Sequence, residues 1–292
     1  MKTITVFTPS YNRAHLLPRL YNSLCKQTCK DFAWLIIDDG STDGTKTLVE
    51  TWIKDNKIEI NYIFQDNQGM HGAHNTAYQN IKTVLNTCVD SDDYMTDDAV
   101  QLILEKWQAV DQTKYAGIIG LDSLEDGSIL GTSFTTEKTT LEDFYLNGGK
   151  GDKKLVYRTD IVNLYPEYPL FSGENYVGLG YKYLLIDKDY ELLTMNKILI
   201  IVEYQDTGSS RNMYAQYVRN PKGFAFIRKQ AMIYSKSRKR RFEETIHYVS
   251  SSLIAKDIYF IKNAPKKLLT VFAIPFGILL YGFIKFKTRK SF

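Results

Sequence analysis

The sequence has few cysteines and no long apolar stretch near its start. Both absences bear on the cellular compartment in which the chain is expected. Cys25, Cys29 and Cys88 are the only cysteines among 292 residues, and they lack the spacing of a metal-ligand set. An odd number of this kind indicates reduced thiols in a reducing compartment rather than a disulfide framework. The first residues alternate as a strand does, so we expect no secretory signal peptide and place the main part of the chain in the cytosol.

Two nucleotide-binding signatures are also missing. The chain contains neither a Gly-x-Gly-x-x-Gly fingerprint nor a phosphate loop ending in Gly-Lys-Ser/Thr. A dinucleotide oxidoreductase and a P-loop NTPase are therefore disfavoured. The sequence shows no internal repeat and no low-complexity tract. Its length suits one large domain, or a domain of ordinary size with an appendage.

Acidic residues are scarce only at the end of the chain. Residues 221–292 contain 16 Lys and Arg but 3 Asp and Glu, whereas residues 1–220 contain 21 and 30. A basic segment of this kind suits nucleic acid or an anionic membrane. Residues 268–284, a run of 17 without a charge, favour the membrane, and we expect no nucleic-acid partner.

The uncharged run is short for a membrane span. As a helix it would reach roughly 25 Å, against a hydrocarbon core of roughly 30 Å. Pro275, Gly277 and Gly282 interrupt the run. We expect a re-entrant or interfacial segment rather than a full span, with a buried core helix as the alternative.

The first part of the chain alternates strand and helix patterns. We predict strands over residues 4–7, 34–37, 59–64, 87–89 and 116–121, and helices over residues 13–26, 45–54, 71–85 and 98–110. Strands separated by helices of this length indicate a parallel, right-handed α/β sheet.

The pattern loosens over residues 130–169, where we expect residues 148–151 to form a mobile loop. A helix over residues 181–187 and a strand over residues 192–202 are predicted next. The rest is predicted to be helical over residues 224–235, 243–261 and the apolar run, with the basic residues 238–241 between the first two helices. We divide the chain into residues 1–220 and a basic helical extension, residues 221–292.

Two clusters of aspartate follow predicted strands. Asp38 and Asp39 end one strand, and Asp90, Asp92 and Asp93 follow another. The carboxyl ends of parallel strands form the ligand-binding edge of an α/β sheet, so both clusters are expected there. Crowded carboxylates favour a divalent cation such as Mg²⁺ or Mn²⁺, which prefers one or two carboxylates plus phosphate oxygens. Turn and helix-start chemistry is the alternative interpretation.

Other loops are expected at the same edge. Residues 8–13 place backbone N–H groups and Arg13 where an anion could bind. Asp39 could accept an imide N–H from a uracil-like base, and helix capping is its competing role. His71 and His74 lack a matching third metal ligand, so a phosphate or ribose hydrogen bond is the preferred role for one of them.

In this order and at these intervals, the motifs at residues 9–13, 38–45, 67–69 and 90–93 resemble family 2 glycosyltransferases, inverting enzymes of the GT-A fold. The resemblance covers about residues 3–120, the expected nucleotide-sugar-binding half, with residues 121–220 as the acceptor half. It implies a Rossmann-like, mostly parallel α/β sheet flanked by helices, a nucleoside-diphosphate-sugar donor, commonly UDP-linked, and a catalytic Mg²⁺ or Mn²⁺. The C-terminal helical extension is expected to associate with the membrane.

The resemblance also implies roles for single residues. Asp39 would face the base, Asp92 would be the principal metal ligand, and Asp90 and Asp93 would support ribose or metal. His74 stands where many relatives have arginine. The expected metal ligands are Asp92 and Asp93, and the expected nucleotide-sugar contacts are Thr8, Pro9, Tyr11, Asn12, Arg13, Asp39, Asn67, Gly69, His74, Asn75, Asp90, Ser91, Asp93 and Arg211.

Inversion needs a carboxylate that deprotonates the acceptor hydroxyl while the diphosphate leaves from the opposite face. Relatives often carry a Glu-Asp pair after a turn of small residues, and here the pair is Glu174-Asn175. We predict Glu174 as the base, with Asp152 and Asp187 in reserve and a cap on the helix near residues 176–183 as the alternative. Arg211, in the loop of residues 203–211, could clamp a diphosphate or be solvated.

These observations predict an enzyme that moves a sugar to a hydroxyl of a lipid-linked or growing saccharide in bacterial cell-surface polysaccharide synthesis. It would work at the cytoplasmic side of the membrane, peripheral or re-entrant. Two alternatives stay open, namely transfer onto a polyprenyl phosphate and a non-catalytic scaffold that binds sugar nucleotides. The intact run of residues 90–93 argues against the scaffold. The oligomeric state is open.

Overall fold

The computed structural model describes residues 2–203 and 213–289 and divides the chain into two compact units. The first unit comprises Met1–Pro166 and Asp189–Gln205, and the second, here called the helical unit, comprises Glu167–Lys188 and Asp206–Phe292. Residues 167–188 and 213–220 therefore group with the C-terminal helices, whereas the sequence suggested a division after residue 220.

The first unit is built on one mixed sheet of nine strands within the described residues, in the order β3-β2-β1-β4-β8-β6-β9-β5, with β7 paired to β9. Strands β1 to β4 are mutually parallel, and β9 is parallel to β6. Strand β8 is antiparallel to both of its neighbours, β4 and β6. The strands are β1 (Ile4–Ser10), β2 (Phe32–Asp38), β3 (Ile60–Phe64), β4 (Leu85–Cys88), β5 (Tyr94–Met95), β6 (Tyr115–Ser123), β7 (Lys138–Thr139), β8 (Lys153–Arg158) and β9 (Glu191–Ile201).

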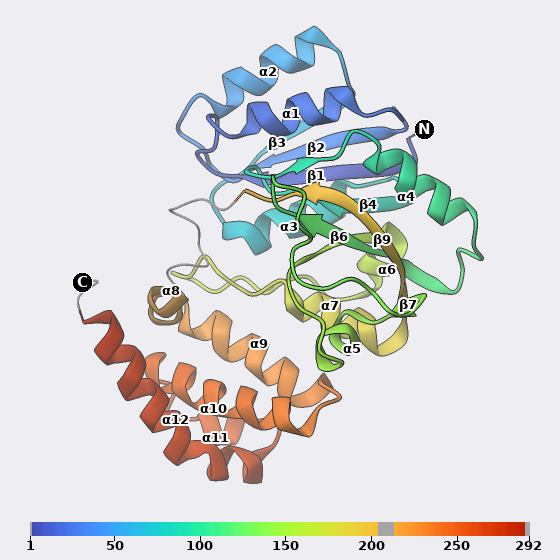
Figure 1. Cartoon of the computed structure of the whole chain (residues 1–292). Helices are drawn as coiled ribbons and strands as arrows, with labels where there is room; N and C mark the ends of the chain where they lie inside the picture. The colour runs from blue at the N-terminus through green and yellow to red at the C-terminus, as the bar shows by residue number, and fades with distance from the viewer. Residues whose placement is uncertain (1, 204–212, 290–292) are drawn as a thin grey trace. The chain divides into compact units, whose positions relative to one another are not determined.

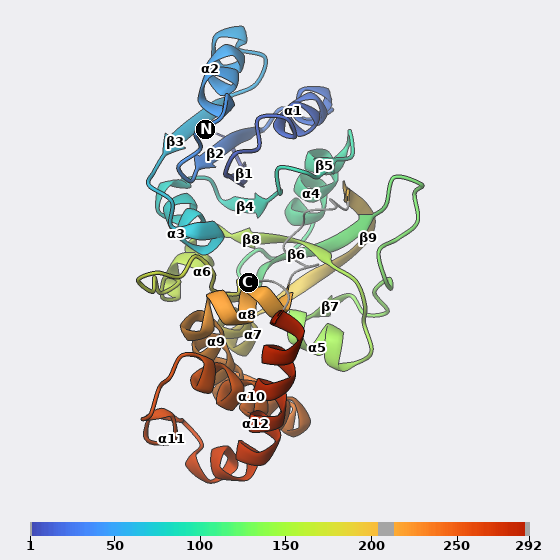
Figure 2. The ribbon, with the colours of Figure 1, turned by 90° about the vertical axis from the view of Figure 1, so that its left-hand side faces the viewer.

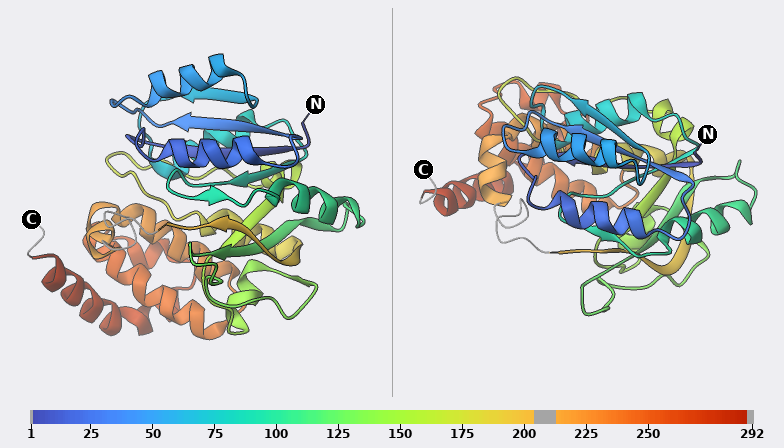
Figure 3. Two further views of the ribbon diagram at one scale, coloured as in Figure 1. Left: turned by 45° about the horizontal axis from the view of Figure 1, so that its top comes forward. Right: turned by 90° about the horizontal axis from the view of Figure 1, so that it is seen from above.

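Helices cover both faces of this sheet, as Figure 2 shows. Helices α1 (Leu17–Lys26), α2 (Thr45–Asp55) and α4 (Ala99–Gln108) share one hydrophobic core with the strands, whereas α3 (Gly69–Asn80) and α6 (Thr159–Leu164) lie on the other face. Figure 3 shows α1 and α2 on the same side of β1 and β2. Tyr21 of α1 stacks on Trp52 of α2 with ring centroids 4.3 Å apart, over the buried Trp34. Because β2 is buried along its whole length, its end is held firmly.

The structure corrects several boundaries near the site. Helix α1 begins at Leu17, not at residue 13, because residues 13–16 form a turn in which the N–H of Leu16 bonds to the carbonyl of Arg13. Arg13 therefore stays in the loop after β1. Helix α3 ends at Asn80 rather than at residue 85, because Ile81 is extended, and β4 then begins at Leu85.

The region of residues 130–169 contains more structure than its pattern indicated. It includes β7, helix α5 (Leu141–Leu146), β8 and α6. Residues 148–151, expected to be a mobile loop, are held by backbone hydrogen bonds from Gly149 to Phe144 and from Thr132 to Lys150.

The helical unit contains α7 (Gly180–Asp189), α8 (Met213–Arg219), α9 (Pro221–Tyr234), α10 (Arg238–Ile254), α11 (Phe260–Asn263) and α12 (Lys267–Thr288). Helix α10 packs between α9 and α12 (Figure 1). The helix predicted over residues 243–261 was wrong at both ends. Ser237 caps α10 by accepting the N–H of Arg240 at 3.2 Å, so the basic residues 238–241 lie inside its first turns.

Candidate active site

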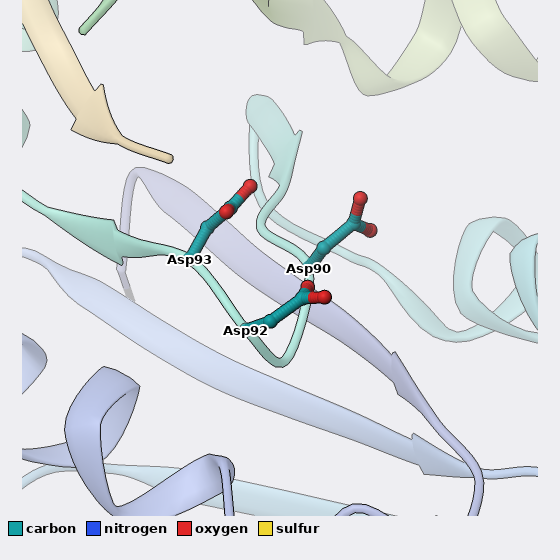
Figure 4. A group of neighbouring side chains, drawn as sticks. All are labelled: Asp90, Asp92 and Asp93. Atoms are coloured by element: carbon teal, nitrogen blue, oxygen red, sulfur yellow. The ribbon is translucent and has the colours of Figure 1, made fainter. Parts of the chain in front are cut away.

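Three aspartates gather on the loop between β4 and β5. One carboxylate oxygen from each of Asp90, Asp92 and Asp93 can be chosen so that the three lie within 4.8 Å of one another. Figure 4 shows the three side chains projecting from this one loop. The N–H of Asp93 donates to the carbonyl of Asp90 at 3.1 Å, and this tight turn brings the carboxylates together.

The electrostatics of the cluster suit a cation. Burial, and after it the charge of Asp90, raises the pKa of Asp92. The same two causes raise the pKa of Asp93 to about 7. The Nη1 of Arg13 lies 3.6 Å from Oδ2 of Asp92. The charge of Arg13 lowers the pKa of Asp92, but burial and Asp90 outweigh it. Hard carboxylate oxygens with excess negative charge are the donor set that Mg²⁺ and Mn²⁺ prefer, so these residues fit such an ion.

A lysine that the sequence reasoning missed lies beside the cluster. The ammonium of Lys154, on β8, donates to the carbonyl of Cys88 at 2.7 Å. Burial acts to lower the pKa of Lys154, but Asp122, Asp90 and Asp93 outweigh it and raise that pKa. Lys154 therefore keeps its charge and offsets part of the negative potential. No pattern near Lys154 in the sequence marks it, because its place beside the cluster depends on the pairing of β8 with β4.

Asp122, at the end of β6, was also missed. Its side chain is only 4% exposed, and burial raises its pKa to about 6, opposed by Lys154. Its Oδ1 has no hydrogen-bond partner within the described part of the chain. Asp122 and Lys154 thus interact electrostatically with each other and with Asp90 of the cluster.

The loop after β1 is tied to the loop after β2. Asn12 has φ 53°, a left-handed conformation that Asn tolerates better than most residues. Its Oδ1 accepts the N–H of Thr42 at 2.8 Å, and its own N–H donates to Oγ of Ser41 at 2.8 Å. Arg13 follows Asn12 in this tied loop, and its Nη1 lies 3.6 Å from Oδ2 of Asp92.

The remaining predicted residues of this segment differ in their exposure. Thr8 is fully buried and its Oγ1 accepts from Nε1 of Trp34 at 3.0 Å, so its side chain belongs to the core. Pro9 is half-buried in β1, whereas the Tyr11 side chain is 50% exposed beside the clamp.

The Asp39 side chain caps helix α3. Its Oδ1 accepts the N–H of Gln68 at 2.9 Å and its Oδ2 accepts the N–H of Gly69 at 2.8 Å, at the start of α3. Gln65 Nε2 also donates to Oδ1, and Asn67 Nδ2 donates to the carbonyl of Asp39. Burial raises the pKa of Asp39 against these hydrogen bonds. An ionised carboxylate has about four acceptor positions, so one is left for a ligand.

The predicted residues within α3 are buried, whereas Asn67 just before it is exposed. His74 is fully buried, its ring meets that of Phe7 at 5.1 Å, and its Nδ1 lies 2.9 Å from the carbonyl of Met70. Asn75 and Ser91 are buried as well. These surroundings make His74 a packed core residue in this structure. The phosphate or ribose contact expected of it stays a prediction.

Glu174 lies in the helical unit at the start of α9. Its Oε1 accepts the N–H of Lys222 at 3.0 Å and its Oε2 accepts the N–H of Gly223 at 2.8 Å. The capping alternative therefore applies to α9 rather than to the helix near residues 176–183, because α7 begins at Gly180. The role of Glu174 as the base stays a prediction. Arg211 lies outside the described residues.

A further contact fixes Asp93 from the end of β9. The N–H of Glu203 donates to Oδ1 of Asp93 at 3.2 Å. The carboxylate of Glu203 pairs with Arg19, which also pairs with Glu125 and lies 4.1 Å from the ring centre of Tyr94. Sequence reasoning expected a substrate loop after β9 but missed Arg19, which also lines a cleft of about 580 Å³.

Comparison with solved structures identifies the fold. The chain superimposes over its whole length on 92% of S. aureus TarS 1–349, solved in complex with UDP-GlcNAc, with a TM-score of 0.66 and 17% identity. A second match is to the mannosyltransferase PcManGT from Pyrobaculum calidifontis, solved with GDP-Man and Mn²⁺. This superposition covers 99% of this chain and 75% of PcManGT, with a TM-score of 0.55 and 14% identity. The fold is therefore that of the GT-A glycosyltransferases.

The chain belongs to glycosyl transferase family 2, whose family model matches residues 5–157, just over half of the sequence. Several curated relatives are 31–34% identical over 103 to 112 residues, and the chain spans only 11–34% of their own length. A longer match, 24% identical over 75% of this chain and 72% of the relative, is to the GalNAc(5)-diNAcBac-PP-undecaprenol beta-1,3-glucosyltransferase of Campylobacter jejuni. The chain thus contains a family 2 glycosyltransferase domain over residues 5–157.

Proposed function

We propose that the chain transfers a sugar, with inversion, from a nucleoside-diphosphate donor to a hydroxyl of a lipid-linked or growing saccharide. The observation that carries this proposal is the cluster of Asp90, Asp92 and Asp93 at the carboxyl edge of the sheet. The donor is proposed to be a UDP-sugar, since TarS was solved with UDP-GlcNAc. A lipid-linked acceptor is supported by the name of the Campylobacter relative.

The chain's own residues have distinct tasks in this proposal. Asp92 and Asp93 would hold Mg²⁺ or Mn²⁺, which when bound neutralises charge on the departing diphosphate. Arg13 adds a fixed positive charge beside Asp92. Asp39 offers its remaining acceptor position to the nucleobase of the donor. Lys154 limits the repulsion among the three carboxylates of the cluster.

The acceptor hydroxyl needs a base, and Glu174 is proposed for it. The alternative of transfer onto a polyprenyl phosphate is favoured by one observation, namely that both oxygens of Glu174 already accept backbone N–H groups of α9. A phosphate acceptor is ionised without help and needs less of a protein base.

The proposal is tested by Mn²⁺-dependent release of nucleoside diphosphate from a panel of sugar donors. We expect Asp92→Asn to lower this release by a factor on the order of 10² or more, because it removes one charged ligand of the ion. Asp98→Asn is the matched control, since Asp98 is exposed and its side chain makes no capping hydrogen bond to α4. Binding of donors without release from any of them would favour the scaffold instead.

A further inference from the structure

Helix α12 presents two different faces. One face is buried and consists mostly of small residues, namely Thr270, Ala273, Gly277, Ile284 and Thr288. The other carries large apolar side chains that are strongly exposed, namely Leu268 (80%), Phe272 (73%), Leu279 (72%) and Phe286 (69%). Both sets recur every three, four or seven residues, which is the spacing of a stripe along a helix.

The buried face is fixed against α10. A Cβ on Gly277 would lie 2.5 Å from the side chain of Val249 and 3.1 Å from the carbonyl oxygen of Ile246, so glycine is what allows this close approach. Near the other end, the ring of Phe283 meets that of Tyr214 on α8 at 5.7 Å. Helix α12 is therefore supported by protein along one side, and Pro275 does not interrupt it as the sequence had suggested.

Length and composition alone would let α12 cross a membrane, since its 22 residues have a mean hydropathy of 1.9 in the most apolar window. Its partner α10 argues against crossing. Helix α10 carries Arg238, Lys239, Arg240, Arg241, Glu243 and Glu244. If α12 spanned the bilayer with α10 attached, charged groups of α10 would enter the hydrocarbon, which is strongly unfavourable.

The exposed stripe is bordered by positive charge. Lys266 and Lys267 stand at the start of α12, and Lys285, Lys287 and Arg289 at its end, whereas residues 258–292 contain no Asp or Glu. The ammonium of Lys285 lies 5.1 Å from the ring centre of Tyr281, so its stem runs along the helix. Next to α11, Ile258 (80% exposed) and Tyr259 (62% exposed) add apolar surface to the same unit.

We propose that α12 lies in the plane of an anionic bilayer surface, with the stripe of Leu268, Phe272, Leu279 and Phe286 inserted between head groups and acyl chains. Helix α10 then stays on the aqueous side, and the lysines at both ends contact anionic head groups. A second copy of the chain suits this surface less, because a symmetric contact would bring the flanking lysines of two copies together. The inference goes beyond the proposed reaction, since it assigns a binding mode to a surface outside the acidic cluster.

Vesicle flotation of the full chain tests this proposal without any donor or metal. We expect at least tenfold stronger binding to vesicles of phosphatidylcholine with phosphatidylglycerol than to phosphatidylcholine alone. The double substitution Phe272→Glu with Leu279→Glu should lower binding at least tenfold. Leu164→Glu is the control, since Leu164 is 68% exposed on α6 of the first unit. Unchanged thermal unfolding of the double variant shows that it folds, and unchanged vesicle binding would overturn the proposal.

Measuring how deep α12 sits in the bilayer distinguishes a helix that lies on the membrane surface from one that spans it. Tryptophan placed singly at positions 268, 279 and 286 is quenched by lipids brominated at different depths. We expect all three positions to report the same shallow depth. A deep position 279 between two shallow ends would overturn the proposal in favour of a span, and a concentration-dependent dimer without vesicle binding would overturn it in favour of a second copy. Failure of the sugar-transfer assay would leave either result unaffected.

Discussion

At the scale of residues, Asp93 links pH to metal binding. Burial and Asp90 raise its pKa to about 7, so below that pH a cation must displace a proton. We expect Mn²⁺ to bind about tenfold more weakly at pH 6 than at pH 8, since one proton is released on binding. Calorimetric titration across this range measures the effect. Asp93→Asn should bind weakly but with little pH dependence, and equal affinities of the wild type at both pH values would contradict the assignment.

Glu174 allows a second test at this scale. Its carboxylate both caps α9 and is the proposed base, and Glu174→Gln separates these roles only in part because the amide keeps one acceptor oxygen. If Glu174 is the base, Glu174→Gln should lower kcat by a factor on the order of 10² or more. Loss of the cap on α9 should lower the free energy of unfolding by about 1 kcal/mol. Asn175→Asp is the useful partner variant, since it keeps Glu174 intact. Unchanged kcat in Glu174→Gln would favour the polyprenyl phosphate acceptor.

The predicted site residues that the structure brings together are those whose neighbours are close in the chain or at adjacent strand ends. Asp90, Asp92 and Asp93 share one loop, and Arg13 reaches them because β1 and β4 are parallel neighbours. Lys154 arrives from β8, more than sixty residues away, and no local pattern marks it. The groups that Asp39 caps also lie far along the chain, since they follow β3.

At the scale of elements, Gly277 decides how closely α12 approaches α10. Because a Cβ there would lie 2.5 Å from Val249, Gly277→Ala should separate the helices and lower the free energy of unfolding by about 1–3 kcal/mol. Gly282→Ala is the matched control, since nothing lies within 4 Å of its Cβ position. It should raise that free energy by about 0.5–1 kcal/mol, because glycine is a poor helix former. Denaturant unfolding measures both, and equal effects would contradict the packing.

The elements predicted well were the strands and helices with long regular patterns, such as β2 and α2. Strand β8 was missed because its sequence mixes Lys153, Lys154 and Arg158 with only a few apolar residues, and its place between β4 and β6 depends on tertiary pairing. Helix α10 was predicted too late because four basic residues resembled a loop, although Ser237 was a capping signal. Helix α12 passes through Pro275 because packing outweighs local preference.

At the scale of the whole molecule, the family and fold could be predicted because four motifs follow one another in the order and at the intervals typical of the family. The grouping of residues 167–188 with the C-terminal helices depends on tertiary packing between segments far apart in the chain, which no local pattern shows. Acceptor chemistry is proposed from relatives and from the surface of α12 rather than from any motif.

The central claim is that Asp92 and Asp93 bind a divalent cation that bridges to the donor diphosphate. The most direct measurement is anomalous diffraction at the manganese edge from crystals soaked with a UDP-sugar and Mn²⁺. We predict a peak at roughly 2 Å from these two carboxylates and from the diphosphate oxygens. A bound UDP-sugar with no manganese peak beside Asp92 would contradict the account.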